Sequence, residues 1–219
     1  MTGEKIKEKA REKEKERRVG GFYCPIKRLC DLLAAYILLL ILYIPMLIIA
    51  LAIKLTSKGG VIFRQIRVGK DGVRFVCYKF RTMRSDAPSQ LSTAEFTDAD
   101  KYITAVGRFL RKTSLDELPQ LFNVLNGDMS IVGPRPLIPS ESEVHKRRSE
   151  LGVYSVRPGI TGLAQVCGRD TVSDGEKVRY DAEYTENLGA LTDMKIILLT
   201  FFKVCSCEGV GLSGEKERS

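Results

Sequence analysis

The chain has 219 residues and a formal net charge of +8, from 35 Lys and Arg against 27 Asp and Glu. This length allows one well-buried core, or one domain together with a membrane segment. The basic balance favours an anionic partner, such as nucleic acid, an acidic membrane surface or a phosphorylated substrate. Because the chain has no Trp and only 8% aromatic residues, a surface that stacks single-stranded bases is disfavoured, and we expect no nucleic-acid partner.

The six cysteines lack the spacing of a metal finger or of a CxxC redox motif. Since the chain has one histidine, His145, we expect no zinc site. We therefore expect reduced thiols on the cytoplasmic side of a membrane. The cysteines are Cys24, Cys30, Cys77, Cys167, Cys205 and Cys207.

Residues 1–21 form a charged arm of Lys, Arg and Glu with almost no apolar periodicity. This composition predicts a solvated helix or a disordered segment. A solubilising tail is the simplest interpretation, and contact with anionic lipid is the alternative. The mixed charge and the missing cleavage motif argue against a secretory signal.

Residues 32–53 read LLAAYILLLILYIPMLIIALAI, with no charged residue. A core helix of so small a domain would rarely be apolar on every face over this length, so the stretch predicts a membrane-embedded helix. Both flanks are basic, whereas a simple span should have its basic residues on one side. Pro45 removes a backbone donor and disfavours the helical conformation at Ile44. We expect residues 22–58 to form a re-entrant helix that bends at Ile44 and Pro45, with a kinked ordinary span as the alternative.

Residues 59–207 are predicted to form a catalytic domain, followed by a loose tail over 208–219. Two runs of β-branched and aromatic residues, 61–68 and 73–80, flank Asp71-Gly72 and predict a β-hairpin. Its cations either form a solvated face or hold a phosphorylated head group. These cations are Arg64, Arg67, Arg74, Lys79 and, just beyond, Arg81.

The rest of the domain predicts a mixed α/β fold, mostly helical, with this one small hairpin. Helices are expected over 100–110, 139–151 and 176–187. The stretch 157–169 predicts a glycine-rich loop shaped for the close approach of a ligand. Residues 193–204 predict a helix that lies in the membrane interface or packs on the core.

The stretch 114–136 reads SLDELPQLFNVLNGDMSIVGPRP and contains the adjacent carboxylates Asp116 and Glu117. Ser114 and Glu117 match a capping box at the start of a helix. Pro119 does not suit that interpretation, because it would fall beyond the positions whose backbone donors are free. The helix therefore begins irregularly, or later than the box suggests.

A chemical role for the two carboxylates is compatible with capping. Neighbouring side chains on a helix diverge by about 100°, so the pair suits divided roles, one residue binding Mg²⁺ and the other attacking phosphorus. An ionised carboxylate needs no base to act as a nucleophile, and Mg²⁺ and arginine can neutralise a diphosphate. Arg111 and Arg135 are placed for this, with Pro134 and Pro136 keeping the backbone of Arg135 stiff.

The motifs KFRTM (79–83), LRKTSLDELPQLFNVLNGDMSIVGPRP (110–136) and RPGITGLAQVCGR (157–169) resemble the bacterial sugar transferase family. The members of this family are the monotopic phosphoglycosyl transferases, which transfer a sugar phosphate to a polyprenyl phosphate. The resemblance covers about residues 22–204 and includes a K-R-x-x-D pattern at Lys27, Arg28 and Asp31. It implies the small form of the family, a re-entrant helix, and a place on the inner leaflet of a bacterial cytoplasmic membrane with the catalytic domain facing the cytoplasm.

By this resemblance, Asp116 is the nucleophile that attacks a UDP-sugar, releases UMP and holds a covalent sugar phosphate. Glu117 is the Mg²⁺ ligand, and a polyprenyl phosphate takes the sugar phosphate as the first membrane step of glycoconjugate assembly. Arg111 contacts phosphate, and residues 134–136 shape the nucleotide pocket. The remaining candidates are either anion contacts or supports of the fold, namely Lys79, Arg81, Arg157 and Arg169.

Two other functions stay open on the residues alone. One is a Mg²⁺-dependent membrane phosphatase or pyrophosphatase, which needs a water-activating base that the motifs do not offer. The other is a basic peripheral membrane or nucleic-acid-binding protein in which residues 114–117 only cap a helix. The transferred sugar, the pathway and the oligomeric state, a dimer included, do not follow from the residues.

Overall fold

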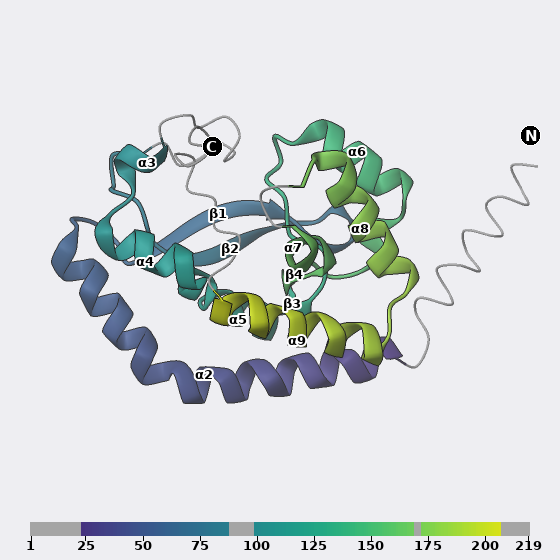
Figure 1. The fold of residues 1–219 in the computed structure, drawn as a ribbon, viewed down its shortest axis with the longest axis horizontal. Helices are drawn as coiled ribbons and strands as arrows, with labels where there is room; N and C mark the ends of the chain where they lie inside the picture. Colours follow the sequence, from purple (N-terminus) through teal and green to yellow (C-terminus); the bar gives the residue numbers. More distant parts are fainter. Residues whose placement is uncertain (1–22, 88–98, 169–171, 207–219) are drawn as a thin grey trace, which may run out of the picture.

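The computed structural model describes residues 23–87, 99–168 and 172–206 (Figure 1). The charged arm, Arg169, Cys207 and the C-terminal tail lie outside these residues. Helices dominate the described part, together with two small two-stranded sheets. The expected mixed, mostly helical fold is therefore confirmed, with a second sheet that was not expected.

The predicted apolar helix is α2, which extends from Tyr23 to Thr56 and continues through Pro45. With 34 residues and a mean hydropathy of 2.8, this helix is by length and composition able to cross a membrane. Figure 1 shows the helix running beneath the rest of the molecule and turning upward in its second half. One face of the helix is exposed and apolar along most of its length. The exposed residues are Ile26, Leu29, Leu33, Tyr36, Ile37, Leu38, Leu40, Ile41, Tyr43, Ile44, Leu47, Ile48, Leu51 and Leu55.

The opposite face of α2 packs on the domain along both halves of the helix. In the first half, Ala35 is fully buried in a cluster with Leu121 and Val124. In the second half, Ile53 is buried in another cluster with Leu110. The helix therefore lies along the domain and does not project from it.

The hairpin is confirmed close to its predicted bounds. Strands β1 (Ile62–Val68) and β2 (Arg74–Phe80) are antiparallel, with Ile66 opposite Val76. A short 3-10 turn, η1 (Lys70–Gly72), connects them, and Asp71 and Gly72 both have positive φ angles. Asp and Gly tolerate this conformation, which is why the Asp-Gly pair marks the turn.

The second sheet consists of β3 (Ser130–Val132) and β4 (Gly159–Thr161), which are parallel. The two strands approach very closely beside Gly133, since a Cβ atom on Gly159 would lie 2.1 Å from the Gly133 nitrogen. The predicted loop over 157–169 is wrong in this respect, because it contains β4 and the short helix α7 (Leu163–Cys167).

The helix predicted over 100–110 is two helices, α3 (Ala99–Tyr102) and α4 (Ala105–Thr113). The break occurs because Thr104 has an extended conformation and its hydroxyl accepts a hydrogen bond from the Gly107 N–H at 2.9 Å. After α4 come η2 (Leu115–Glu117), α5 (Gln120–Asn126), α6 (Ser142–Glu150) and η3 (Val153–Ser155). The chain continues with α8 (Asp174–Glu186) and α9 (Ala190–Ser206).

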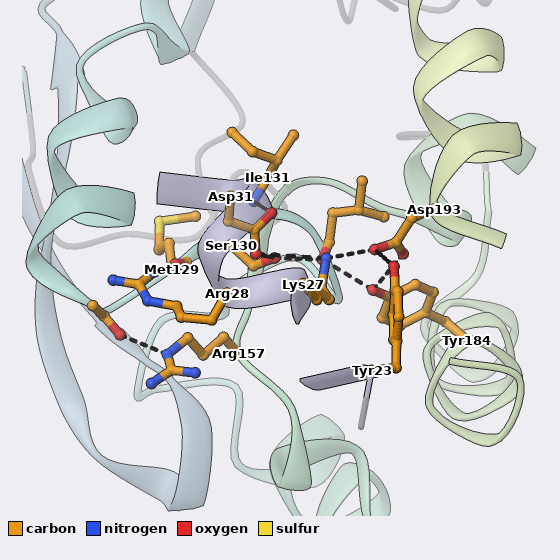
Figure 2. A network of polar contacts seen from close by, with 12 residues as sticks. Tyr23, Lys27, Arg28, Asp31, Met129, Ser130, Ile131, Arg157, Tyr184 and Asp193 are labelled. Atoms are coloured by element: carbon orange, nitrogen blue, oxygen red, sulfur yellow. Dashed lines mark hydrogen bonds and ion pairs between the residues drawn. The ribbon is translucent and has the colours of Figure 1, made fainter. Parts of the chain in front are cut away.

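A polar network fixes the first turns of α2 to the domain (Figure 2). Lys27 Nζ donates to Asp193 of α9 at 2.6 Å, and the Tyr23 hydroxyl donates to the same carboxylate at 2.7 Å. Asp31 is buried and accepts from the Ser130 hydroxyl at 2.6 Å and from the Ile131 N–H. The predicted K-R-x-x-D pattern thus joins α2 to β3 and α9.

Helix α9 buries Asp193 and Ile196 against the domain and has a largely exposed apolar face that includes Leu198, Phe201 and Phe202. Both expected environments are compatible with this pattern, because one face packs on the core and the other is available to a membrane surface.

Candidate active site

The two adjacent carboxylates lie in η2, the single 3-10 turn between α4 and α5. Ser114 precedes this turn with a positive φ of 58°, which is uncommon for a residue with a side chain and occurs preferentially at functional sites. The predicted capping box is wrong, because the Ser114 side chain makes no capping hydrogen bond and α5 begins only after Pro119. A true capping box exists instead at Ser173 and Glu176, at the start of α8.

Glu117 is held by two cations from distant parts of the chain. Lys79 Nζ, at the end of β2, donates to Glu117 Oε1 at 2.7 Å. A guanidinium nitrogen of Arg135 lies 3.1 Å from the same oxygen. The side chain of Glu117 is 15% exposed, so these ion pairs are partly shielded from water. The structure therefore brings together three of the residues predicted from the sequence.

Asp116 differs from its neighbour. Within the part of the chain that the structure describes, its carboxylate forms no ion pair with a cation. Arg111 lies near enough to act on it electrostatically, and the Nε of Arg111 donates to the Thr82 hydroxyl at 2.9 Å. One carboxylate is thus neutralised, while the other lies beside the same cations without an ion-pair partner among the described residues.

The pKa values of the two carboxylates move in opposite directions. Burial alone would raise the pKa of Glu117, but Lys79 and Arg135 outweigh burial and lower this pKa to about 2. Burial raises the pKa of Asp116, and the charge of Glu117 adds to this rise against the opposing effect of Lys79, Arg111 and Arg135. Such divergence between neighbouring acids is typical of residues with different chemical roles.

The Gly-Pro-Arg-Pro loop is held at every residue by its main chain. The Gly133 N–H donates to the Thr161 carbonyl, and the Pro134 carbonyl accepts from the Gly159 N–H. The Arg135 carbonyl accepts from Arg148 at 2.8 Å, and the Pro136 carbonyl accepts from Arg67 at 2.9 Å. The side chain of Arg135 therefore reaches Glu117 from a fixed backbone.

Two of the arginines predicted as either anion contacts or supports of the fold, Arg81 and Arg157, support the fold in this structure. Arg81 donates to the Lys58 and Ser57 carbonyls and to the Ser57 hydroxyl, so that it holds the C-terminal end of α2. Arg157 donates to the Gly127 carbonyl at 2.8 Å, in the turn between α5 and β3, where Figure 2 shows it beside Arg28. The contacts of neither arginine involve Asp116 or Glu117.

Three supporting residues did not emerge from the sequence. Thr82 lies within the KFRTM motif, yet nothing local shows that it holds Arg111. Arg148 and Asp181 form a buried ion pair beneath the Gly-Pro-Arg-Pro loop. These two residues are 33 positions apart, and a contact of that range leaves no local periodicity to detect.

The predicted Mg²⁺ fits the donor set only if substrate oxygens complete its coordination. Among the described residues no group of three or more His, Cys, Asp or Glu side chains could hold a metal ion. Mg²⁺ is typically bound by one or two carboxylates together with substrate phosphates and water. Both contacts of Glu117 with cations use Oε1, so its second oxygen is the one that could serve a metal ion.

Comparison with known proteins shows which enzymes the chain resembles. A glucose-1-phosphate transferase of Klebsiella pneumoniae, named for UDP-glucose and undecaprenyl phosphate, is 43% identical over 192 residues, which are 84% of this chain and 41% of the relative. An undecaprenyl-phosphate galactose phosphotransferase of Salmonella typhimurium is 42% identical, over 80% of this chain and 39% of the relative. The chain thus spans about 40% of the length of these two relatives.

A shorter relative, the uncharacterized sugar transferase EpsL of Bacillus subtilis, is 41% identical over 84% of this chain and 90% of its own length. The family profile described as "Bacterial sugar transferase" matches residues 22–207. This range includes α2, the hairpin, both carboxylates and α9. The chain therefore belongs to the bacterial sugar transferase family.

Proposed function

We propose that the chain transfers a sugar 1-phosphate from a UDP-sugar to a polyprenyl phosphate and releases UMP. The observation that carries this proposal is the contrast between the two neighbouring carboxylates. Glu117 is paired with Lys79 and Arg135, whereas Asp116 has no cation at ion-pair distance among the described residues. The names of the relatives, which refer to undecaprenyl phosphate and to UDP-glucose or galactose, support the same reaction class.

In the first step, a carboxylate oxygen of Asp116 attacks the phosphorus next to the sugar. The bond from this phosphorus to the bridging oxygen breaks, and the electron pair leaves with UMP. In the second step, a phosphate oxygen of the polyprenyl phosphate attacks the same phosphorus, and Asp116 leaves as a free carboxylate. The two steps consume one molecule of each substrate and return the enzyme unchanged.

The cations around the pair are suited to hold the diphosphate. Lys79, Arg111 and Arg135 all act electrostatically on Asp116, so a diphosphate placed within reach of Asp116 would meet three positive charges. Arginine binds phosphate with two parallel hydrogen bonds, and this lowers the repulsion between the carboxylate and the phosphate. Glu117 would hold Mg²⁺, which supplies further neutralisation of the phosphate oxygens when it is bound.

We also infer that α2 enters and leaves the membrane on the same side, bending at Ile44 and Pro45. The first turns of α2 bind Asp193 and β3, whereas Arg81, just after the hairpin, binds Ser57 directly beyond its C-terminal end. A helix that crosses a hydrocarbon core about 30 Å thick could not contact one water-facing domain at both ends. The exposed apolar face of α2 would then lie in one leaflet, on the cytoplasmic side, where a lipid phosphate can reach Asp116.

The direct test is turnover by the purified chain in nanodiscs that contain undecaprenyl phosphate. Mg²⁺ and a panel of UDP-sugars are supplied, beginning with UDP-glucose and UDP-galactose, and UMP and lipid product are measured. The proposal predicts about one UMP per enzyme without the lipid and continuous UMP release with it. Asp174→Asn, an exposed position on α8, is the matched control for Asp116→Asn. Continuous UMP release without the lipid would contradict the proposal, because it would indicate hydrolysis.

A further inference from the structure

A buried ion pair joins α6 and α8 and contacts the Gly-Pro-Arg-Pro loop. Arg148 is 2% exposed and Asp181 is 1% exposed. One terminal nitrogen of Arg148 pairs with Asp181, and the other donates to the Arg135 carbonyl at 2.8 Å. The fork of the guanidinium thus links a carboxylate on α8 to the main chain of the residue whose side chain neutralises Glu117.

Stability alone does not account for this pair. Removing two charges from water costs so much that a buried ion pair is often no better than a pair of apolar residues. The Nε of Arg148 is in addition buried and has no hydrogen-bond partner within the described part of the chain. A buried donor without a partner is a further cost. We therefore look for the role of the pair in the residue that it contacts, Arg135.

What the pair holds is the main chain of Arg135, through its carbonyl oxygen. The neighbouring anchors at Pro134 and Pro136 come from Gly159 and Arg67, and they act on residues whose rings already restrict the backbone. Upstream, the Tyr184 hydroxyl of α8 donates to the Val132 carbonyl at 3.0 Å. Helix α8 thus holds β3 through Tyr184 and the loop that follows it through Asp181 and Arg148.

We propose that Arg148, oriented by Asp181, is a positioning residue that holds Arg135 in place for the diphosphate of the substrate; this rests on the proposed function. Loss of the anchor lets the Arg135 backbone shift, and the guanidinium then no longer meets Glu117 and the diphosphate together. A displacement of about 1 Å at a positioning group can cost about 100-fold in rate. The effect should therefore appear in nucleotide binding and in kcat/KM.

The experiment replaces both charges at once, with Arg148→Met and Asp181→Leu in the same protein. This double variant leaves no unpaired buried charge, so we expect a Tm at or above that of the wild type. We expect its Kd for UDP in the presence of Mg²⁺, measured in nanodiscs, to rise about 10-fold or more, and kcat/KM to fall by about 10- to 100-fold. Arg179→Met, at an exposed position of the same helix, is the control and should match the wild type.

A double-mutant cycle with Arg135→Ala separates positioning from a general structural role. If Arg148 acts through Arg135, the Arg148/Asp181 change has little further effect once Arg135 is an alanine. Fully additive losses, or an unchanged Kd for UDP in the double variant, would overturn the proposal. Should the double variant fail to fold, Arg148→Lys serves in its place, because one ammonium group retains Asp181 but lacks the fork that also reaches the Arg135 carbonyl.

The binding measurement also distinguishes this proposal from the one on which it rests. UDP binding needs no turnover, so it reports on the loop even if no UDP-sugar of the panel yields UMP. A wild-type chain that binds UDP without turnover would weaken the proposed reaction and leave the positioning role testable.

Discussion

At the scale of single residues, the site depends on two adjacent acids, Asp116 and Glu117, that differ in their ion pairs and in their pKa values. Glu117 is held ionised by Lys79 and Arg135, and its pKa is about 2. Asp116 is kept beside the same cations with a raised pKa. Of the two, Asp116 is therefore the carboxylate that no cation among the described residues engages at ion-pair distance.

The raised pKa of Asp116 leads us to a prediction about the thermal stability of the folded protein. The folded protein binds this proton more tightly than the unfolded chain does, so ionised Asp116 destabilises the fold at neutral pH, and this effect is lost as pH falls through the folded-state pKa. Asp116→Asn should therefore raise Tm at pH 7 while it lowers kcat at least about 1,000-fold.

Thermal melts of the Asp116→Asn variant and the wild type, at pH 7 and at successively lower pH, measure this difference. The gap in Tm should close towards acid. A variant that is less stable than the wild type at pH 7 would show that Asp116 supports the fold.

At the scale of elements, α5 is joined to the hairpin by one buried side chain. Asn123 is fully buried, its Nδ2 donates to the Val76 carbonyl at 2.7 Å, and its Oδ1 accepts from the Tyr78 N–H at 3.0 Å. The amide thereby satisfies the free edge of β2 in place of a third strand. Because Lys79 is the last residue but one of β2, this contact also fixes the distance between Lys79 and η2.

We predict that Asn123→Leu destabilises the protein by about 2 kcal/mol, since two main-chain groups of β2 lose the partner that this buried side chain supplies. Urea unfolding of the variant in detergent measures the loss. Asn126→Ala, at an exposed position of the same helix, is the control and should change stability by less than about 0.5 kcal/mol beyond its helix propensity. Equal stability of the Asn123 variant and the wild type would contradict this account of α5.

The elements that the sequence predicts well are those with a local signal. The Asp-Gly turn locates the hairpin, the uninterrupted apolar run locates α2, and Asn126-Gly127 marks the end of α5. Strands β3 and β4 have three residues each, too few for a period to appear. Their pairing depends on the close approach of Gly133 and Gly159, which is a long-range contact.

The difference between local signals and long-range contacts also explains which site residues can be predicted from the sequence. The carboxylates and the cations Lys79, Arg111 and Arg135 can be predicted because they stand in dense motifs. That Arg81 holds the end of α2 and Arg157 holds a turn depends on where distant segments meet, as does the pair of Arg148 and Asp181. Residue type alone cannot separate a phosphate contact from a support for a carbonyl, because an arginine serves both.

At the scale of the whole molecule, the domain and α2 form one packed unit. The helix is buried against the domain on one face and exposed and apolar on the other. This arrangement would hold the site at the membrane surface, where a lipid phosphate and a soluble nucleotide sugar can meet.

The same-side arrangement predicts the accessibility of both ends of α2. In a chain whose exposed cysteines are changed to serine, single cysteines are introduced at Pro25 and Lys58, both exposed, and at Lys177 on α8 as a domain control. A membrane-impermeant maleimide should label all three from the same side of the membrane. Labelling of the Pro25 and Lys58 positions from opposite sides would contradict the re-entrant arrangement.

The covalent role of Asp116 is the central claim, and mass spectrometry tests it most directly. The chain is mixed with Mg²⁺ and the UDP-sugar that gives turnover, without polyprenyl phosphate, then quenched and analysed intact and after digestion. The account predicts an added sugar phosphate on the peptide that contains Asp116, its disappearance when polyprenyl phosphate is added, and no adduct in Asp116→Asn. Lipid product formed at the full rate with no adduct at any time, or by the Asp116→Asn variant, would contradict it.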